Sequence, residues 1–268
     1  MVRVALAQMN SNADRARNRA LVEGYAEQAA AQGARFLALP EAAFYLGPSA
    51  QLPAHAGPLD ASHPDFACLT QTARHRDLEI LCGGFWELAP DGRVHNTSVL
   101  IGKDGALVAA YRKIHLFDAT LPDGKRLDES AQVSPGSAVV TAGTCLGTLG
   151  LSICYDLRFA ELYLALRAQG AEVLSIPAAF TVPTGAAHWE VLVRARAIET
   201  QCFALAPAQV GHHFGERTSF GHALAVDPWG NVLLNLGPEQ TGIGCVDLDL
   251  DLLSQVRTRM PIASHRRL

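Results

Sequence analysis

Short apolar strands alternate with amphipathic helical segments along the whole chain, and this alternation is the strongest constraint on the fold. In the first half we expect strands at residues 2–9, 35–39 and 79–85, with helices at 13–32 and 63–76. Several of these strands are almost continuously apolar, so both faces of their sheet must be covered. Helices packed over sheets are the arrangement that meets this requirement.

The second half of the chain repeats the pattern. The expected strands are 146–153, 172–176, 202–207, 221–226, 231–236 and 243–248, and the expected helices are 157–169 and 187–201. Between the two halves, segment 94–112 predicts two strands joined by a tight turn at Lys103-Asp104-Gly105. Two βαβ-like halves predict an α/β fold in which two sheets pack together with helices outside.

Composition narrows the functional classes. The 268 residues are 49% hydrophobic and 18% charged, with a formal net charge of −4. This apolar content excludes a disordered chain, and the weak negative charge speaks against a nucleic-acid partner. No stretch approaches ~18 uninterrupted apolar residues, so we expect no membrane span.

The N-terminus and the cysteines predict the location. Residues 1–10 are strand-like and become polar too quickly for a secretory signal peptide. The six cysteines contain no C-x-x-C pair, and at least five are expected to be buried free thiols. Because disulfides are rare in reducing compartments, both features predict a cytoplasmic protein.

Familiar catalytic and metal-binding signatures are missing from the sequence. It contains no G-x-S-x-G elbow, no phosphate loop and no H-E-x-x-H pair. We expect His212-His213 in a solvated loop, because no further ligands cluster nearby. Asp247, Asp249 and Asp251 indicate an exposed strand face that runs into a helix, since the full calcium-loop pattern is absent.

Three residues stand out on chemical grounds. Cys154 ends an apolar strand immediately before a helix, where backbone N–H groups and the helix dipole would lower the pKa of the thiol. Glu41 follows Pro40 at a strand end, where burial would raise its pKa and suit it to general-base work. Lys113 carries a charge that can stabilise an oxyanion. Taken singly, each residue is better explained by an ordinary role: a buried structural cysteine, a surface-loop glutamate and a solvated loop lysine.

Together, these residues lie in segments that resemble the nitrilase (carbon–nitrogen hydrolase) superfamily. The segments are Leu39-Pro40-Glu41, YRKIHLFDATLPDG (111–124), GLSICYDLRFAELY (150–163), PTGAAHWEVLVRARAIETQC (183–202) and GHALAVDPWG (221–230). The resemblance covers essentially the whole chain. It implies one domain over residues 1–268, folded as a four-layer α-β-β-α sandwich of two mixed sheets.

The resemblance also implies roles for individual residues. In a Glu–Lys–Cys triad, Glu41 is the general base, Lys113 the oxyanion-stabilising cation and Cys154 the nucleophile. Glu129 falls where the family carries a second active-site glutamate, near Lys113, and the backbone N–H of Tyr155 would help to hold the oxyanion. The implied reaction is attack on an amide carbonyl, followed by hydrolysis of a thioester. No metal or organic cofactor is implied.

Two stretches resemble the deaminated glutathione amidase branch of the superfamily. They are HWEVLVRARAIETQC (188–202) and AQVGHHFGERTSFGHALAVDPWG (208–230). The implied reaction cleaves the 2-oxoglutaramyl amide bond of deaminated glutathione to 2-oxoglutarate and cysteinylglycine. An omega-amidase acting on 2-oxoglutaramate or 2-oxosuccinamate is the alternative. A nitrilase acting on nitriles and a non-enzymatic protein that kept the fold also stay open.

A substrate that carries carboxylates needs cationic or hydrogen-bonding partners. The candidates are Arg158, Thr184, His188, Arg194 and Arg217, with Tyr155 and Phe180 as walls. Helical spacing predicts that at least one of Arg194 and Arg196 forms a structural salt bridge instead. The resemblance further implies a homodimer or larger homo-oligomer, formed through the helix after the nucleophile and the C-terminal region.

Overall fold

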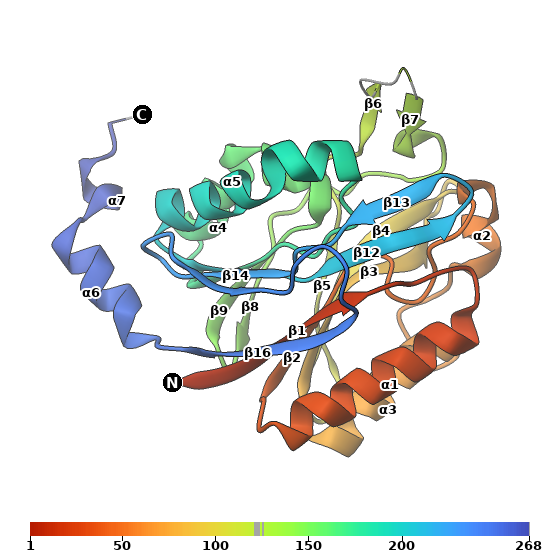
Figure 1. Cartoon of the computed structure of the whole chain (residues 1–268), viewed down its shortest axis with the longest axis horizontal. Helices are drawn as coiled ribbons and strands as arrows, with labels where there is room; N and C mark the ends of the chain where they lie inside the picture. Colours follow the sequence, from red (N-terminus) through yellow and green to blue (C-terminus); the bar gives the residue numbers. More distant parts are fainter. Residues whose placement is uncertain (121–123, 125, 268) are drawn as a thin grey trace.

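Two β-sheets pack face to face in the computed structural model, which describes residues 1–120, 124 and 126–267. The larger sheet has the order β13-β12-β1-β2-β3-β4-β5, with β16 antiparallel to β1 (Figure 1). Its strands are β1 (Val2–Met9), β2 (Phe36–Leu39), β3 (Glu79–Leu88), β4 (Val94–Ile101), β5 (Leu107–Arg112), β12 (Ala208–Phe214), β13 (Arg217–Phe220) and β16 (Gly242–Leu248).

The smaller sheet has the order β15-β14-β11-β10-β9-β8. Its strands are β8 (Thr141–Thr144), β9 (Gly147–Leu151), β10 (Val173–Ser175), β11 (Phe203–Ala206), β14 (Leu224–Val226) and β15 (Val232–Asn235). Strands β9, β10 and β11 run parallel to one another, as do β1, β2 and β3 in the larger sheet. A separate ribbon pairs β6 (Asp118–Thr120) with β7 (Arg126–Asp128).

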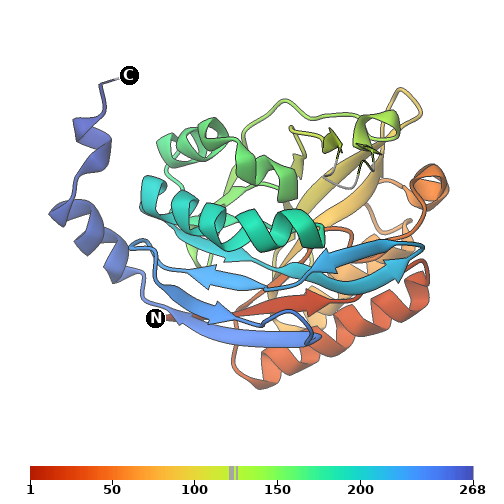
Figure 2. The same ribbon diagram turned by 45° about the horizontal axis from the view of Figure 1, so that its top comes forward.

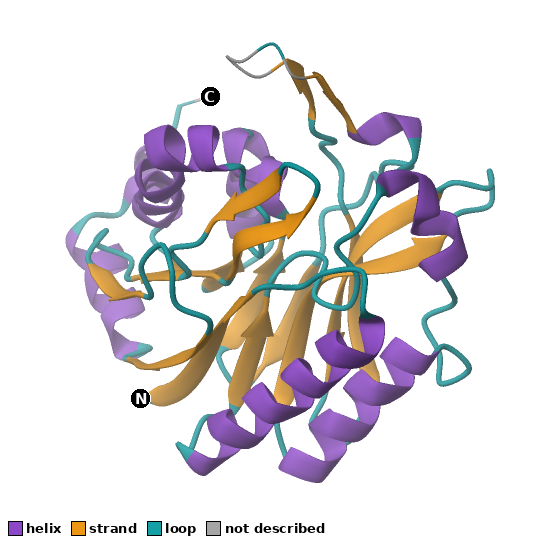
Figure 3. Ribbon diagram, turned by 45° about the vertical axis from the view of Figure 1, so that its right-hand side comes forward, coloured by secondary structure: helices purple, strands orange, loops and turns teal. Residues whose placement is uncertain are grey.

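Helices cover the outer face of each sheet. On the larger sheet these are α1 (Arg15–Ala31) and α3 (Pro64–Arg76), which lie side by side (Figure 3). On the smaller sheet they are α4 (Ala160–Ala168) and α5 (Val182–Thr200) (Figure 2). The C-terminal helix α6 (Asp251–Arg259) packs at the edge of the body and buries Leu253 and Val256, and α7 (Ile262–His265) extends beyond it. Short turns of helix are η1 (Ser49–Gln51), α2 (Leu52–His55), η2 (Glu129–Ala131) and η3 (Cys154–Arg158).

Strand β1 shows why the strands are continuously apolar. Val4 and Leu6 point into the core between the two sheets, whereas Ala5 and Ala7 pack on the α1 side with Val22. Each of these side chains is fully buried. Both faces of the strand therefore lose contact with water, which confirms the predicted α-β-β-α layering. Within the described residues, no helix combines the length and apolar character needed to cross a membrane.

Strand β1 begins and ends where the sequence predicts, but two other expectations need correction. The helix expected at 157–169 begins only at Ala160, because the five residues from Cys154 form a 3₁₀ turn. The His212-His213 loop is part of a hairpin between β12 and β13, and β12 pairs with the end of β1. His213 is therefore buried, with its ring nitrogens 2.7 Å from the Ser11 carbonyl and 2.9 Å from Ser219 Oγ.

The cysteines depart slightly from expectation as well. Cys68, Cys82, Cys154 and Cys202 are buried, whereas Cys145 and Cys245 are only partly buried, so four thiols rather than five are fully sequestered. All six are free thiols.

Candidate active site

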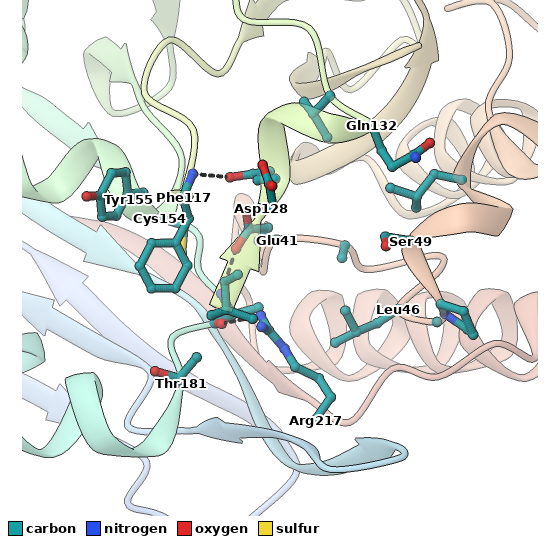
Figure 4. A pocket seen from close by; sticks show the side chains of 18 of the residues that line it. Glu41, Leu46, Ser49, Phe117, Asp128, Gln132, Cys154, Tyr155, Thr181 and Arg217 are labelled. Atoms are coloured by element: carbon teal, nitrogen blue, oxygen red, sulfur yellow. Dashed lines mark hydrogen bonds between the residues drawn. The ribbon is translucent and has the colours of Figure 1, made fainter. Parts of the chain in front are cut away.

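Glu41, Lys113 and Cys154 come from both sheets and meet in one pocket. Glu41 follows β2, Lys113 follows β5 directly, and Cys154 follows β9 across the core. All three line a pocket of about 500 Å³ (Figure 4). Because the two sheets pack face to face, strand ends that are far apart in sequence open into the same space.

A sharp backbone turn presents the Cys154 side chain. The φ angle of Cys154 is +50°, in the left-handed region that residues other than glycine rarely adopt. The turn is fixed because the Cys154 N–H donates to the Pro177 carbonyl at 2.9 Å. The Asp156 carboxylate accepts from the Ile153 N–H at 2.9 Å, so it closes this turn rather than capping the later helix. A strained conformation held this firmly is typical of a functional site.

The Glu41 carboxylate is held by groups from separate parts of the chain. Its Oε1 accepts from Asn96 Nδ2 at 2.9 Å and from Lys113 Nζ at 3.2 Å, and its Oε2 accepts from the Ala179 N–H at 2.9 Å. The Cys154 thiol also interacts with this carboxylate, because each of the two groups shifts the pKa of the other. Only 8% of the Glu41 side chain is exposed, so its orientation is fixed by these contacts.

Lys113 lies between two carboxylates. Its Nζ is 3.2 Å from Glu41 Oε1 and 2.9 Å from Glu129 Oε2, and only 2% of its side chain is exposed. Glu129 begins η2 and also accepts from the Phe117 N–H at 2.6 Å, a contact drawn in Figure 4. The second glutamate therefore fixes both the Lys113 ammonium and the segment that follows it.

The protonation states differ from those expected from sequence. Burial raises the pKa of the Cys154 thiol well above its usual range, and the negative charge of Glu41 raises it further. Burial also raises the pKa of Glu41, but the Lys113 charge and hydrogen bonds from Cys154 and Lys113 outweigh it and lower the pKa below 4.5. The pKa shifts of Cys154 and Glu41 are both opposite in direction to those expected from the sequence. The groups that cause these shifts come from other parts of the chain. The site at rest holds a neutral thiol beside an ionised carboxylate.

The structure brings most of the predicted binding residues to the pocket. Tyr155, Arg158, Phe180, Thr184 and Arg217 all line it. The Arg158 guanidinium lies 5.6 Å from the Tyr155 ring centroid and 5.5 Å from that of Phe180. This places a cation in the pocket against two aromatic walls.

His188 and Arg194 are not among the pocket-lining residues that the structure describes. His188 lies one helical turn beyond Thr184, and its Nδ1 is 3.4 Å from both terminal nitrogens of Arg158. Arg194 turns outward, and its Nε donates to the Gly230 carbonyl at 2.9 Å. Arg196 is also structural, with an ion pair to Glu199 at 2.8 Å, so the prediction of a structural arginine is confirmed.

Sequence reasoning missed Asn96 and Ala179, two groups that contact Glu41. Asn96 lies in the fully buried strand β4, within the polar run His95-Asn96-Thr97-Ser98. Consecutive polar residues in a buried strand need partners, and this run was a usable signal. Ala179 acts through its backbone N–H, which no sequence signal reveals. Within the described residues, no three His, Cys, Asp or Glu side chains are grouped to hold a metal ion.

Comparison with known proteins shows which family the chain matches. The carbon-nitrogen hydrolase family model matches residues 3–258. A deaminated glutathione amidase from Synechocystis sp. is 42% identical over 266 residues, which cover 98% of this chain and 97% of the relative. The Homo sapiens deaminated glutathione amidase is 41% identical over 273 residues, with coverage of 98% and 82%.

Solved structures show the same relationship. The NitFhit protein of C. elegans superposes with a TM-score of 0.93 at 37% identity, over 99% of this chain. This chain spans 65% of that longer protein. With a family match along nearly its full length and relatives above 40% identity, the chain belongs to the carbon–nitrogen hydrolase family.

Proposed function

We propose that the chain is a cysteine-dependent amidase that hydrolyses the 2-oxoglutaramyl amide bond of deaminated glutathione. The products are 2-oxoglutarate and cysteinylglycine. The observation that carries the proposal is the buried cluster of Cys154, Glu41 and Lys113 in one pocket. Relatives about 42% identical over 98% of the chain are deaminated glutathione amidases, which supports the choice of substrate.

Attack by Cys154 is coupled to proton transfer. The thiol is neutral at rest and interacts with the ionised Glu41 carboxylate. As the Cys154 Sγ–carbon bond forms, the thiol proton passes to Glu41 and the carbonyl π electrons move to oxygen. The developing oxyanion is stabilised by the Lys113 ammonium and the Tyr155 backbone N–H.

Glu41 then changes from base to acid. When the tetrahedral intermediate collapses, the C–N bond breaks and Glu41 returns the proton to the departing amine. This leaves a thioester on Cys154 and an ionised Glu41. A water molecule, deprotonated by Glu41, attacks the thioester, and the proton finally returns to the Cys154 sulfur as 2-oxoglutarate leaves.

Recognition of the acyl group falls to residues beside Cys154. We assign the 2-oxo acid carboxylate to the Arg158 guanidinium, with the Thr184 hydroxyl nearby in the same pocket. His188 contacts both terminal nitrogens of Arg158 and positions the guanidinium rather than binding substrate. Guanidinium groups suit this task because their planar donors match carboxylate geometry.

A substrate panel tests the function. We expect a higher kcat/KM for deaminated glutathione than for 2-oxoglutaramate, 2-oxosuccinamate or simple nitriles, measured with the same purified enzyme. A kcat/KM at least as high on the small free amides would assign the chain to omega-amidases. Absence of hydrolysis with every compound would leave only a non-enzymatic role.

The proposal also covers the domain organisation, the cellular location and the oligomeric state. We propose that residues 1–268 form one domain, because the site draws on both sheets. The free thiols support a cytoplasmic location, where disulfides are rare. We also propose a homodimer, formed through the C-terminal helices and the helical layer of the smaller sheet, where α4, the helix after the nucleophile, packs beside α5. The exposed apolar residues of this layer lie on the outer face of α5. On that face, Val191 is 68% exposed and Ile198 two turns later is 45% exposed, and Met260 before α7 is 42% exposed.

Sedimentation tests the dimer. At micromolar concentration we expect a species of twice the 28.6 kDa chain mass. Val191→Glu introduces a charge into the proposed apolar interface and should shift the species to 28.6 kDa. Val108→Glu is a matched control, because Val108 is also exposed but lies on β5 in the other sheet. A monomeric parent chain would contradict the proposal.

A further inference from the structure

The pocket extends on both sides of the Glu41 carboxylate. In Figure 4, Tyr155 and Thr181 lie on the Cys154 side of Glu41. Leu46, Ser49 and Gln132 lie on the opposite side, and all of these residues line the same pocket. An enzyme that released only ammonia would have little use for this second compartment.

The proposed chemistry tells which half of the substrate enters which compartment. The acyl group stays bonded to Cys154 and so occupies the side of Tyr155 and Arg158. The amine must leave toward the group that protonates it, which is Glu41. We propose that the compartment beyond Glu41 is a leaving-group subsite for the cysteinylglycine portion, with Arg217 as the residue that binds its terminal carboxylate. This inference rests on the proposed amidase function.

Arg217 has the contacts expected of a substrate-binding cation. It begins β13 and lines the pocket, and its Nη2 donates to the Ala179 carbonyl at 3.0 Å. Its Nε is buried and has no hydrogen-bond partner among the described residues. No carboxylate in the described part of the chain forms an ion pair with it. Arg217 is half-buried, and its charge acts on Glu41 without forming an ion pair with it. A half-buried guanidinium with a sequestered, unpartnered Nε favours a carboxylate ligand.

The walls of this compartment are preformed and largely apolar. The Trp86 Nε1 donates to the Tyr45 carbonyl at 2.9 Å, and the Tyr45 hydroxyl donates to Gln51 Oε1 at 3.0 Å. These contacts fix the segment that carries Leu46 and Ser49. Leu46, Trp86 and Val133 then provide an apolar lining suited to the small thiol side chain of the leaving dipeptide.

A substrate-by-enzyme cycle tests the subsite. The two substrates are 2-oxoglutaramyl-cysteinylglycine and its C-terminal carboxamide, which lacks only the terminal charge. For the parent enzyme, we expect kcat/KM to be about 10- to 100-fold higher for the carboxylate. In Arg217→Met this ratio should fall to about 1, because the partner of the carboxylate is gone. Arg158→Met is the matched control, and it should lower both rates without changing the ratio.

A second variant keeps the test independent of Arg217. Ser49 is exposed at the rim, so Ser49→Trp fills the compartment without entering the core. It should lower kcat/KM at least tenfold for the dipeptide amide and less than threefold for 2-oxoglutaramate. An unchanged carboxylate-to-carboxamide ratio in Arg217→Met, or equal losses on both substrates in Ser49→Trp, would overturn the subsite. A parent enzyme inactive on the dipeptide amide would instead overturn the proposed function.

Discussion

Replacing Cys154 with alanine is expected to lower kcat/KM on the amide substrate by about 10⁴- to 10⁶-fold. The reason is that no other described thiol or hydroxyl in the pocket is known to interact with the Glu41 carboxylate as this thiol does. Substrate binding should persist, because Arg158 and Arg217 remain in place. Steady-state rates and a direct measurement of Kd with the inactive variant check the two expectations.

Serine at the same position and a second cysteine provide the controls for this prediction. Cys154→Ser should also be strongly impaired, since a hydroxyl is a poorer nucleophile beside a weak base. Cys245→Ala removes a partly buried thiol from β16, which lies outside the described pocket lining, and should retain parent activity. A Cys154→Ala variant that keeps more than a tenth of the parent rate would refute the assignment of the nucleophile.

Replacing Lys113 with methionine is expected to impair both stability and catalysis. The change leaves Glu41 and Glu129 together in the interior without the ammonium that lies 3.2 and 2.9 Å from them. Breaking a buried ion pair by removing one partner costs about 3–5 kcal/mol of unfolding free energy. Loss of the oxyanion cation should lower kcat by a further factor of about 10² to 10³.

The pH dependence separates the electrostatic role of Lys113 from a packing role. In the folded parent chain the pKa of Glu41 lies below its ordinary value of 4.5, so its stabilising ionised form is present at neutral pH and is lost as pH falls through that lowered pKa. Without Lys113 the pKa of Glu41 rises. The acid limb of kcat/KM should therefore move to higher pH in Lys113→Met.

Two further variants complete this test. Lys103→Met removes a lysine that is 64% exposed and pairs with the 80% exposed Asp77, so it should change stability by less than about 0.5 kcal/mol. Adding Glu129→Gln to Lys113→Met removes one of the two carboxylates that have lost their ammonium partner. The double variant should regain part of the free energy of unfolding but not the activity. Denaturant unfolding monitored at pH 7 provides the free energies. A Lys113→Met variant as stable as the parent would contradict the buried-pair argument.

Local sequence patterns predicted many of the helices and strands, because these elements depend on interactions between residues that are close in the sequence. The apolar run of β1 and the Ala-rich segment of α1 lie within two residues of their predicted bounds. Hairpin β12–β13 was missed because its pairing depends on β1, two hundred residues earlier. The late start of α4 has a similar origin, since Asp156 closes a turn that includes the strained Cys154.

The residues of the candidate site also fall into those that the sequence predicted and those that only the structure could place. Long motifs pointed to Glu41, Lys113 and Cys154, and the structure brings these residues together. Motifs did not distinguish Arg158 and Arg217, which line the pocket, from Arg194, which bonds to Gly230 outside it. Whether a side chain on a helix faces the pocket depends on what packs against that helix. The spacing of residues along the helix does not contain this information.

The sequence by itself determined the alternation of strands and helices, the family resemblance and the identity of the three central residues. Only the tertiary structure decided their chemical state. Burial and the negative charge of Glu41 keep Cys154 neutral, whereas the Lys113 charge and hydrogen bonds outweigh burial and keep Glu41 ionised. Hydropathy patterns reflect neighbours along the chain, whereas a pKa reflects neighbours in space, and those neighbours exist only after the two sheets have packed.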